Sequence, residues 1–509
     1  PKGVRVNSSL KFPAATLAFF AMTLAARGCA LADGNLANLN HVIIVMQENH
    51  SFDNYFGALP YDPQSPYHPA SAGPCSSSDN KCVDGLTCTN GSSGLVCTNF
   101  NRELHRGREN AFHNPRYCTG PDLAHGWRQA HQELNSSMPN AALRHSRNNG
   151  FVIVNQKDEQ DLSGESPGDD TMGFYDQDEL PFYYGLAETF ALDDRYFCEV
   201  PGPTMPNRSY LMAGTSFGHV TTSEMIPPAG GYKPITGTIF DLLDQAGVSW
   251  LSYAADTPYS SMFRGSDQSH VRSMSNFFAD AAAGTLPALA LVDSSMSPDQ
   301  QIGSGIFETD EHPPSDIRAG EYFVWQIVSA MRASPQWKDS IVFITYDEHG
   351  GFYDHVAPPA AAQNGALNPD GISPGMCADL SNPPASQTPG SGAECSASQA
   401  EVKSLCRGFK ADAKYPRACA NFNQLGVRVP FLAVSPFAKP QYVSHTVADH
   451  ASMLALVEKR FLQGAHLTAR DANASTLEDM FDFDNSPSLG ASIPDAPPLP
   501  LVNDPGCPP

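Results

Sequence analysis

The stretch His41-Val-Ile-Ile-Val-Met-Gln-Glu-Asn-His-Ser-Phe-Asp-Asn-Tyr-Phe-Gly57 decides the fold of this chain. It opens with a continuous apolar run, Val42 to Met46, which is typical of a strand buried on both faces. The run ends directly in Glu48 and Asn49, whose side chains carry oxygen donors. Because ligands of open α/β sheets bind beyond the carboxyl ends of the strands, this segment predicts a site for a hard cation or a phosphate. A capped strand-to-helix turn is the alternative when the segment is taken alone.

Similar apolar or β-branched runs recur along the chain and alternate with amphipathic stretches. This alternation predicts a doubly wound α/β fold, in which a mostly parallel sheet carries helices on both faces. The further strands that we expect are Val248–Tyr253, Leu289–Val292, Ile341–Tyr346 and Val427–Val434. The expected helices are Ile235–Ala246, Gly320–Ala333 and Ala451–Phe461.

A single catalytic domain over residues 33–484 is the organisation that we expect, since the apolar content of 41% supports a large core. Two segments, at about 61–118 and 358–425, interrupt the strand–helix alternation and are rich in small residues, Pro and Cys. We interpret them as disulfide-bearing loop insertions. Residues 485–509 form a Pro-rich C-terminal tail.

Residues 1–32 have the pattern of a secretory signal peptide: a basic start, an apolar run from Phe12 to Ala26, and a small-residue cleavage site ending at Ala32. An anchoring helix is the alternative, although the apolar run is short for a bilayer. Eleven of the twelve cysteines follow Ala32. Their grouping indicates disulfides formed in an oxidising compartment, and a zinc cluster is disfavoured because no CxxC pair occurs. We therefore expect a secreted or periplasmic protein.

The formal charge of −23 argues against nucleic acid as a partner, because an acidic surface repels its phosphates. A phosphate ester remains compatible with this charge, since one bound cation reverses the potential inside a pocket. An acidic surface also gives no attraction to anionic bilayers. The acidic surface therefore favours zwitterionic lipids or soluble esters as substrates. Peripheral contact with a membrane is compatible with it.

A second strand-like run, Ile341–Tyr346, ends in Asp347 and Glu348, and two glycines follow at 350 and 351. If this strand neighbours the first, four side chains with oxygen donors meet at one point. Such a set suits Mg, Ca or Mn, with Zn or Fe as alternatives. The glycines allow a close backbone approach or a positive φ. A solvated acidic turn is the competing interpretation.

The third informative segment is Cys198-Glu-Val-Pro-Gly-Pro-Thr-Met-Pro-Asn-Arg-Ser-Tyr210. Prolines and a glycine surround Thr204 and fix the backbone there, which gives its hydroxyl a defined direction. A threonine hydroxyl is a weak nucleophile until a metal or a base lowers its pKa. Taken alone, Thr204 is better explained as the cap of a helix that begins near Asn207.

Together these segments resemble the phosphoesterase family that contains bacterial and plant phospholipases C and an acid phosphatase branch, within the alkaline-phosphatase-like superfamily. The resemblance extends from His41 to Phe483, outside the two insertions. Its motifs are Glu48-Asn-His-Ser-Phe-Asp53, Pro201-Gly-Pro-Thr204, Pro206-Asn-Arg208, Glu311-His-Pro-Pro314 and Asp347-Glu-His-Gly-Gly351. The resemblance implies an alkaline-phosphatase-like fold.

It also implies roles for individual residues. One divalent metal ion would be bound by Glu48, Asn49, Asp347 and Glu348. Thr204 would be the nucleophile that forms a phosphoenzyme, and His312 would protonate the leaving alkoxide. The further residues that we expect to contact the substrate phosphate are Asn207, His125 and His355.

The implied activity is that of a phospholipase C-like phosphodiesterase acting on phospholipids through a phosphothreonine. Ser replaces Thr204 in the phosphatase branch, so Thr favours the phospholipase branch. An acid phosphatase acting on phosphomonoesters is the first alternative, and a secreted binding protein without activity is the second. Aromatic residues near the nucleophile would line a cage for a quaternary ammonium group or, as we favour, pack in the core. They are Phe174, Tyr175, Phe182, Tyr183 and Tyr184.

Overall fold

The structure of the 509-residue chain is a computed structural model. It describes residues 36–502 apart from 72, 93, 106, 119, 142–145, 164–169, 225–226, 228–229, 266, 362–367, 380–394 and 412, and apart from the side chains of 159–163. The predicted signal peptide lies outside the described residues. Residues 35–509 cluster as one compact unit. Within the described part, no helix combines the length and the apolar character needed to cross a bilayer.

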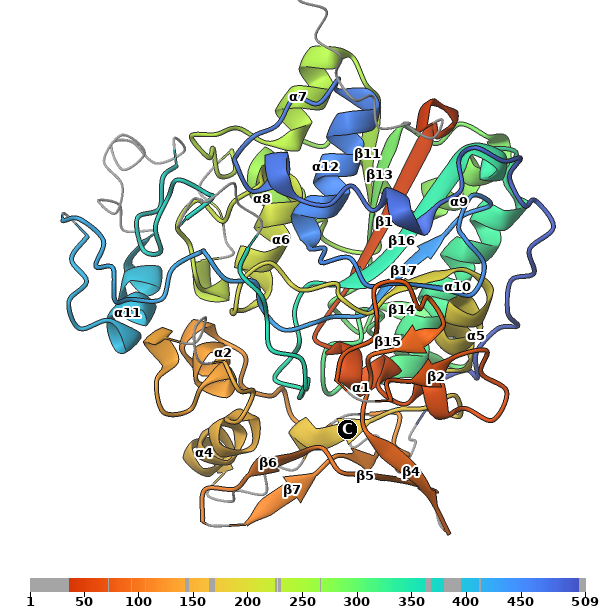
Figure 1. The fold of residues 1–509 in the computed structure, drawn as a ribbon. Helices are drawn as coiled ribbons and strands as arrows, with labels where there is room; N and C mark the ends of the chain where they lie inside the picture. Colours follow the sequence, from red (N-terminus) through yellow and green to blue (C-terminus); the bar gives the residue numbers. More distant parts are fainter. Residues whose placement is uncertain are drawn as a thin grey trace, which may run out of the picture. The chain divides into compact units, whose positions relative to one another are not determined.

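An eight-stranded sheet forms the centre of the fold, in the order β12-β11-β13-β1-β16-β17-β10-β18 (Figure 1). Strand β1 (His41–Gln47) lies between β13 (Leu289–Asp293) and β16 (Ser340–Tyr346) and is parallel to both. Strand β17 (Phe431–Val434) is antiparallel to both of its neighbours, while the other neighbouring pairs are parallel. The remaining strands are β10 (Ala191–Asp193), β11 (Trp250–Ala254), β12 (Val271–Ser273) and β18 (Tyr442–Ser444). The prediction of a mostly parallel sheet is confirmed.

Helices cover both faces of this sheet, as the sequence predicts. Figure 1 shows α6 (Thr204–Ala213), α7 (Ile239–Ala246) and α12 (His450–Phe461) on one side of it. On the other side lie α5 (Pro181–Thr189), α9 (Met274–Ala283) and α10 (Ile317–Ala333). The central strand is buried by these two layers, and its residues 42–46 are at most 3% exposed. A continuous apolar run is therefore what its position requires.

Local chemistry explains where the observed elements differ from the expected ones. Helix α7 begins four residues later than predicted, because Thr238 and Asp241 form a capping box at its start. Helix α10 begins three residues earlier, because the side chain of Asp316 accepts a hydrogen bond from the amide of Arg318. Strand β17 is shorter than predicted, since Pro430 has no amide hydrogen for the ladder.

The two Cys-bearing segments carry short hairpins, one helix and four described disulfides. The pairs are Cys75–Cys82, Cys88–Cys97, Cys377–Cys395 and Cys406–Cys419. Cys118 is also disulfide-bonded, and Cys198 is a buried free thiol. The prediction of disulfides rather than a zinc cluster is confirmed for these residues. The tail packs on the core through Ile493, and the carbonyl of Ala491 accepts a hydrogen bond from Arg332.

Figure 1 shows the hairpins β4–β5 and β6–β7 below the helix α1 that follows β1, with α2 and α4 to the left. The short strands are β2 (His68–Pro69), β3 (Cys82–Val83), β4 (Cys88–Gly91), β5 (Gly94–Cys97), β6 (Phe100–Arg102), β7 (Arg108–Asn110), β8 (Phe112–His113), β9 (Gly173–Phe174), β14 (Gln300–Ile302) and β15 (Gly305–Phe307). The other helices are α1 (Phe52–Phe56), α2 (Trp127–Leu134), α4 (Phe151–Ser163), α8 (Ser261–Arg264) and α11 (Ser396–Leu405).

Candidate active site

The ends of β1 and β16 bring three carboxylates together. Gln47 pairs with Tyr346 in the parallel register, so the residues that follow leave the sheet side by side. Glu48, Asp347 and Glu348 each offer an oxygen atom, and these atoms all lie within 4.8 Å of one another. All three side chains are buried, at no more than 2% exposed. The convergence that we expected from two strand ends is present, at the sheet edge where open α/β folds bind ligands.

The backbone at this edge adopts conformations that few residues tolerate. Asn49 has a φ of 63° and Glu311 a φ of 71°, both in the left-handed region. Such strain concentrates where a fold holds side chains for function. Gly350 has a φ of 61°, and a Cβ placed on it would come within 2.2 Å of the Asn49 carbonyl oxygen. The glycine predicted to allow a close approach therefore lets the two strand ends meet.

The amide of Asn49 lies between the carboxylates and His312. Its amide oxygen faces Glu348 and lies 3.2 Å from Glu48 Oε2, while its nitrogen lies 3.1 Å from His312 Nε2. Oxygen facing oxygen is unfavourable unless a cation lies between them or the amide is turned over, so that its nitrogen donates to the carboxylates. Turned over, the amide donates to Glu48 and Glu348 and accepts from His312 Nε2, so it links the histidine to the carboxylates.

Arg208 is the positive charge that the site already contains. Its guanidinium donates to Glu48 Oε1 at 3.0 Å and to Asp347 Oδ2 at 3.1 Å, and stacks 3.8 Å from the centre of the Tyr259 ring. Tyr259 also donates a 2.6 Å hydrogen bond to Glu48. One arginine against three carboxylates leaves a formal charge of −2, and burial together with Glu48 raises the pKa of Asp347 well above its ordinary value.

Arg208 belongs to the Pro206-Asn-Arg208 motif, but the sequence predicted no role for it. The spacing could have indicated a role, because Arg208 follows Thr204 by four residues and therefore lies on the same face of the helix. Tyr259 gave no comparable signal, since it lies in a loop far from the motifs in sequence.

Thr204 is the first residue of α6, and its hydroxyl donates to Glu48 Oε2 at 3.4 Å. Pro203 holds the cap position, so the alternative in which Thr204 caps a later helix is wrong. The side chain is 7% exposed. Its hydroxyl thus lies beside the carboxylate cluster, at a helix N-terminus whose partial positive charge favours a phosphate.

His312 faces the same point from a separate loop. Its Nδ1 lies 2.7 Å from the Pro313 carbonyl and donates to it, which leaves Nε2 directed toward Asn49. Burial lowers the pKa of His312, but the carboxylates of Glu48 and Asp122 outweigh burial and raise it above its ordinary value. The ring is therefore able to carry a proton on Nε2 near neutral pH.

The backbone before His312 is anchored by the buried carboxylate of Glu311. Its oxygens accept hydrogen bonds of 2.6 Å from three tyrosine hydroxyls, and burial raises the pKa of Glu311 to about 7. The tyrosines are Tyr55, Tyr183 and Tyr346. The five aromatic residues considered for an ammonium cage are at most 2% exposed, so core packing, the interpretation that we favoured, is correct.

His125 lies beside the three carboxylates, with Nε2 3.7 Å from Glu348 Oε1. On the other side of Glu348, His349 Nδ1 lies 3.3 Å from Oε2, and His349 Nε2 lies 2.8 Å from Glu133. Hydrogen-bonded series of side chains such as Glu348–His349–Glu133 orient the ligands in metal sites of other proteins. Glu133 had no role in our sequence analysis, because 216 residues separate it from His349.

Two expected substrate residues lie elsewhere. The Asn207 amide accepts from Val200 N at 2.9 Å and donates to the carbonyls of Gly202 and Pro203, so it braces the turn before Thr204 instead of facing a substrate. His355 is bonded to Asp53 at 2.7 Å and lies 3.4 Å from Asp84, beside a different cavity. Hydrogen bonds within the protein use both side chains in this structure, and contact of Asn207 and His355 with a phosphate stays a prediction.

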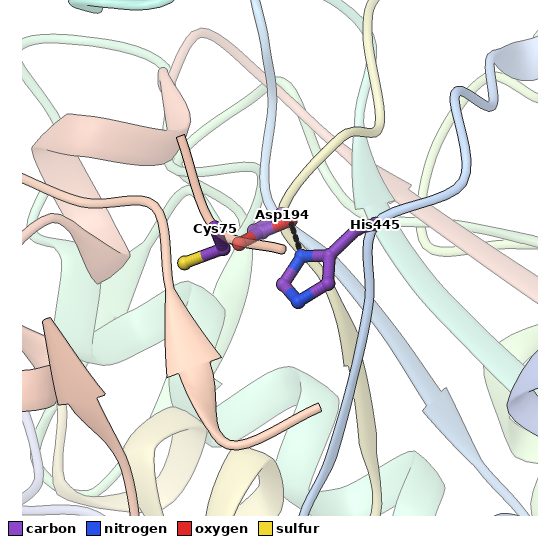
Figure 2. A group of neighbouring side chains, drawn as sticks. All are labelled: Cys75, Asp194 and His445. Carbon is purple, nitrogen blue, oxygen red and sulfur yellow. Dashed lines mark hydrogen bonds and ion pairs between the residues drawn. The ribbon is translucent and has the colours of Figure 1, made fainter. Parts of the chain in front are cut away.

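Other clusters of acidic, His and Cys side chains in the described residues are less suited to a cation. Figure 2 shows one, formed by Cys75, Asp194 and His445. Its sulfur is bonded to Cys82, and both nitrogens of His445 have oxygen partners, Asp194 at 2.7 Å and the Asp79 carbonyl at 3.0 Å. The cluster around Glu48 differs, because its carboxylates exceed its positive charges. Its oxygen donors fit one hard divalent cation.

Comparisons with known proteins identify the family of this chain. Residues 39–462 match the Phosphoesterase family. Non-specific phospholipase C4 of Arabidopsis thaliana is 28% identical over 87% of this chain and 72% of its own length. Phospholipase C B of Mycobacterium tuberculosis is 27% identical over 94% and 85%.

Among solved structures, a protein of the alkaline phosphatase superfamily from Vibrio parahaemolyticus is 12% identical, covers 80% of this chain and 85% of its own, and has a TM-score of 0.30. A TM-score this low carries no argument about the site. The family match spans most of the chain, from before β1 to the end of α12. The chain therefore belongs to the Phosphoesterase family and is a hydrolase that acts on phosphoester bonds.

Proposed function

We propose that this protein is a metal-dependent phosphoesterase of the phospholipase C type, which cleaves a phosphodiester of a phospholipid through a phosphothreonine at Thr204. The observation that carries the proposal is the hydrogen bond from the Thr204 hydroxyl to Glu48, a carboxylate of the three-acid cluster. A buried hydroxyl beside an unbalanced group of carboxylates is the arrangement that nucleophilic phosphoryl transfer needs.

The residues that would hold one divalent ion are Glu48, Asn49, Asp347 and Glu348. When bound, such an ion would lower the pKa of the Thr204 hydroxyl and neutralise charge on the phosphoryl oxygens. Arg208 balances one carboxylate and fixes the orientation of two of them. The remaining charge of −2 matches one divalent ion.

In the first step, Thr204 Oγ1 forms a bond to phosphorus while the bond from phosphorus to the alcohol oxygen breaks. The hydroxyl proton leaves along the hydrogen bond to Glu48 Oε2. The proton on His312 Nε2 passes to the departing alkoxide, which leaves as an alcohol. The enzyme then carries the phosphorylated head group on Thr204.

In the second step, a water molecule attacks the same phosphorus and gives a proton to His312 Nε2, now neutral. The bond from phosphorus to Thr204 Oγ1 breaks, and the hydroxyl regains its proton from Glu48. The phosphorylated head group is released. Each residue returns to its starting state, as a catalytic cycle requires.

Two features support a phospholipid substrate. Threonine occupies the nucleophile position, where the resemblance to the phosphatase branch implies serine. The relatives named above are phospholipases C. We also infer export, because four described disulfides fit an oxidising compartment.

The test compares Thr204→Ala and Thr204→Ser with the wild-type protein on phosphatidylcholine micelles and on a soluble aryl phosphate. Thr204→Ala is expected to lose at least about 10⁴-fold in turnover while keeping its bound metal, and Thr204→Ser to keep measurable turnover. A folded Thr204→Ala protein of unchanged activity would remove Thr204 from the mechanism. Faster cleavage of the aryl phosphate by the wild type would assign the phosphomonoesterase activity instead.

A further inference from the structure

A cavity of about 750 Å³ lies apart from the carboxylate cluster, between helix α2, the turn at 139–141 and the segment 414–424. Its volume is in the range of small-molecule sites. Its lining includes none of the side chains that we assign to phosphoryl transfer. Any ligand that it binds is therefore distinct from the group bound at Thr204.

The charge of this cavity contrasts with the charge of the chain. Among the described residues that line it, the charged ones are Lys414 and Arg417 and none is Asp or Glu, although the chain has a formal charge of −23. Both cations are exposed, and neither forms an ion pair with any described residue. Two unbalanced cations at one cavity create a local positive potential, which attracts an anion.

A buried amide gives a second, independent indication. Gln424 lines the cavity and is 3% exposed, yet its Nε2 has no hydrogen-bond partner among the described residues. A buried donor without a partner is costly, and an acceptor atom of a ligand would satisfy it. The cavity thus combines two cations with an N–H group that lacks an acceptor.

We propose that this cavity binds a phosphate or phosphate-ester anion, held by Lys414, Arg417 and the Gln424 amide. Arginine and lysine are the side chains best suited to phosphate oxygens, because their hydrogen bonds to them are charge-assisted. The choice of phosphate among oxyanions rests on the proposed function. The anion comes either from free phosphate or from the head group of a lipid, and the two experimental arms below separate these sources.

The first arm is calorimetric titration of the metal-loaded protein with inorganic phosphate at constant ionic strength. The test variant is Lys414→Ala/Arg417→Ala, and the control is Arg407→Ala/Lys410→Ala, which removes two exposed cations of the same insertion outside the cavity. The wild type and the control are expected to show a phosphate site that weakens at least about 10-fold in the test variant. The affinity for phosphate at the proposed metal centre is expected to be the same in all three proteins.

The second arm is co-sedimentation with phosphatidylcholine vesicles, with and without phosphatidic acid. If the anion is a lipid head group, phosphatidic acid increases binding of the wild type and the control but not of the test variant. If it is free phosphate, only the titration distinguishes the variants. Identical behaviour of the wild type and the test variant in both arms would overturn the proposal.

Two further measurements separate this site from the catalytic one. Aryl phosphate turnover by Lys414→Ala/Arg417→Ala is expected to equal that of the wild type, so failure of this proposal leaves the proposed function intact. Gln424→Leu removes the unpaired amide, and it is expected to weaken phosphate binding while the melting temperature is unchanged or higher. Unchanged phosphate affinity in both variants would contradict the assigned site.

Discussion

Two buried arginines in this protein, Arg208 and Arg428, have similar contacts but lie in clusters that differ in net charge. Arg208 contacts Glu48 at 3.0 Å and Asp347 at 3.1 Å and stacks on Tyr259. Arg428 contacts Asp53 and Asp354, each at 3.0 Å, and stacks on Phe52. Each guanidinium is thus held by two carboxylates and one aromatic ring.

The clusters differ in the charges around each pair. Around Arg428, the third carboxylate is Asp84, and Arg195 and His355 supply two further positive groups. Although burial opposes it, Asp53 and Asp84 raise the pKa of His355 to about 10, so the ring is charged and the cluster is neutral. Around Arg208, the further carboxylates are Glu348 and Glu133, and His349 lies 3.3 Å from the first and 2.8 Å from the second. Although burial opposes it, these two carboxylates raise the pKa of His349 to about 9, so two positive groups face four carboxylates. Charge balance therefore distinguishes the cluster around Arg428 from the cluster around Arg208, at which we propose that a cation binds.

The largest expected effect comes from removing a carboxylate of the unbalanced cluster. Glu48→Gln keeps the shape of the side chain and removes one ligand charge, so metal binding and turnover are expected to fall by about 10³-fold or more. In the presence of a chelator, its free energy of unfolding is expected to equal or exceed that of the wild type, because repulsion with Asp347 is relieved. Metal analysis, turnover and urea denaturation measure these effects.

The balanced cluster is expected to respond in the opposite way. Arg428→Met leaves Asp53 and Asp354 buried without their cation, and the free energy of unfolding is expected to fall by about 3–5 kcal/mol. Bound metal per folded molecule is expected to stay at the wild-type level. Urea denaturation and metal analysis test this, and a metal loss in Arg428→Met as large as in Glu48→Gln would contradict the division between the clusters.

The sequence predicted the parts of the site that depend on strand ends. Asn49 and Asp347 are 298 residues apart, but each directly follows a strand, and parallel neighbours end at one edge. His355 follows a recognised motif, yet its ring bonds to Asp53 of α1 and belongs to a different cluster from that of Glu48. Local sequence does not encode such pairings between loops. The first residues of α7 and α10 depend on capping side chains. The spacing of apolar residues locates a helix but does not show where it begins.

The pH dependence of stability sharpens the comparison at His355. Because its pKa is about 10 in the fold and near 6.5 in an unfolded chain, its charged hydrogen bonds contribute fully below pH 6.5. This contribution is lost as pH rises through 10. His355→Gln is therefore expected to cost about 2 kcal/mol at pH 6 and little at pH 10.5. Urea denaturation at both pH values measures it, and an equal cost at both would contradict a charged His355.

The smallest expected effect concerns the chain from Glu133 through His349 to Glu348. Glu133→Gln removes the carboxylate that holds His349 at 2.8 Å, so Glu348 is oriented less firmly and metal affinity is expected to fall about 10-fold. Glu321→Gln is the matched control, since Glu321 is equally buried but bonds only to the amides of Phe182 and Tyr183 among its described hydrogen bonds.

Chelator-buffered titrations with Mg²⁺, Ca²⁺ and Mn²⁺ measure the affinity of both variants. Both substitutions alter a buried carboxylate and are expected to lower stability. Only Glu133 is connected, through His349, to Glu348 of the unbalanced cluster. Equal metal affinity in the two variants would show that His349 is held by packing alone. A loss of metal affinity in Glu133→Gln alone would show that metal binding also depends on a carboxylate that does not itself contact the cation.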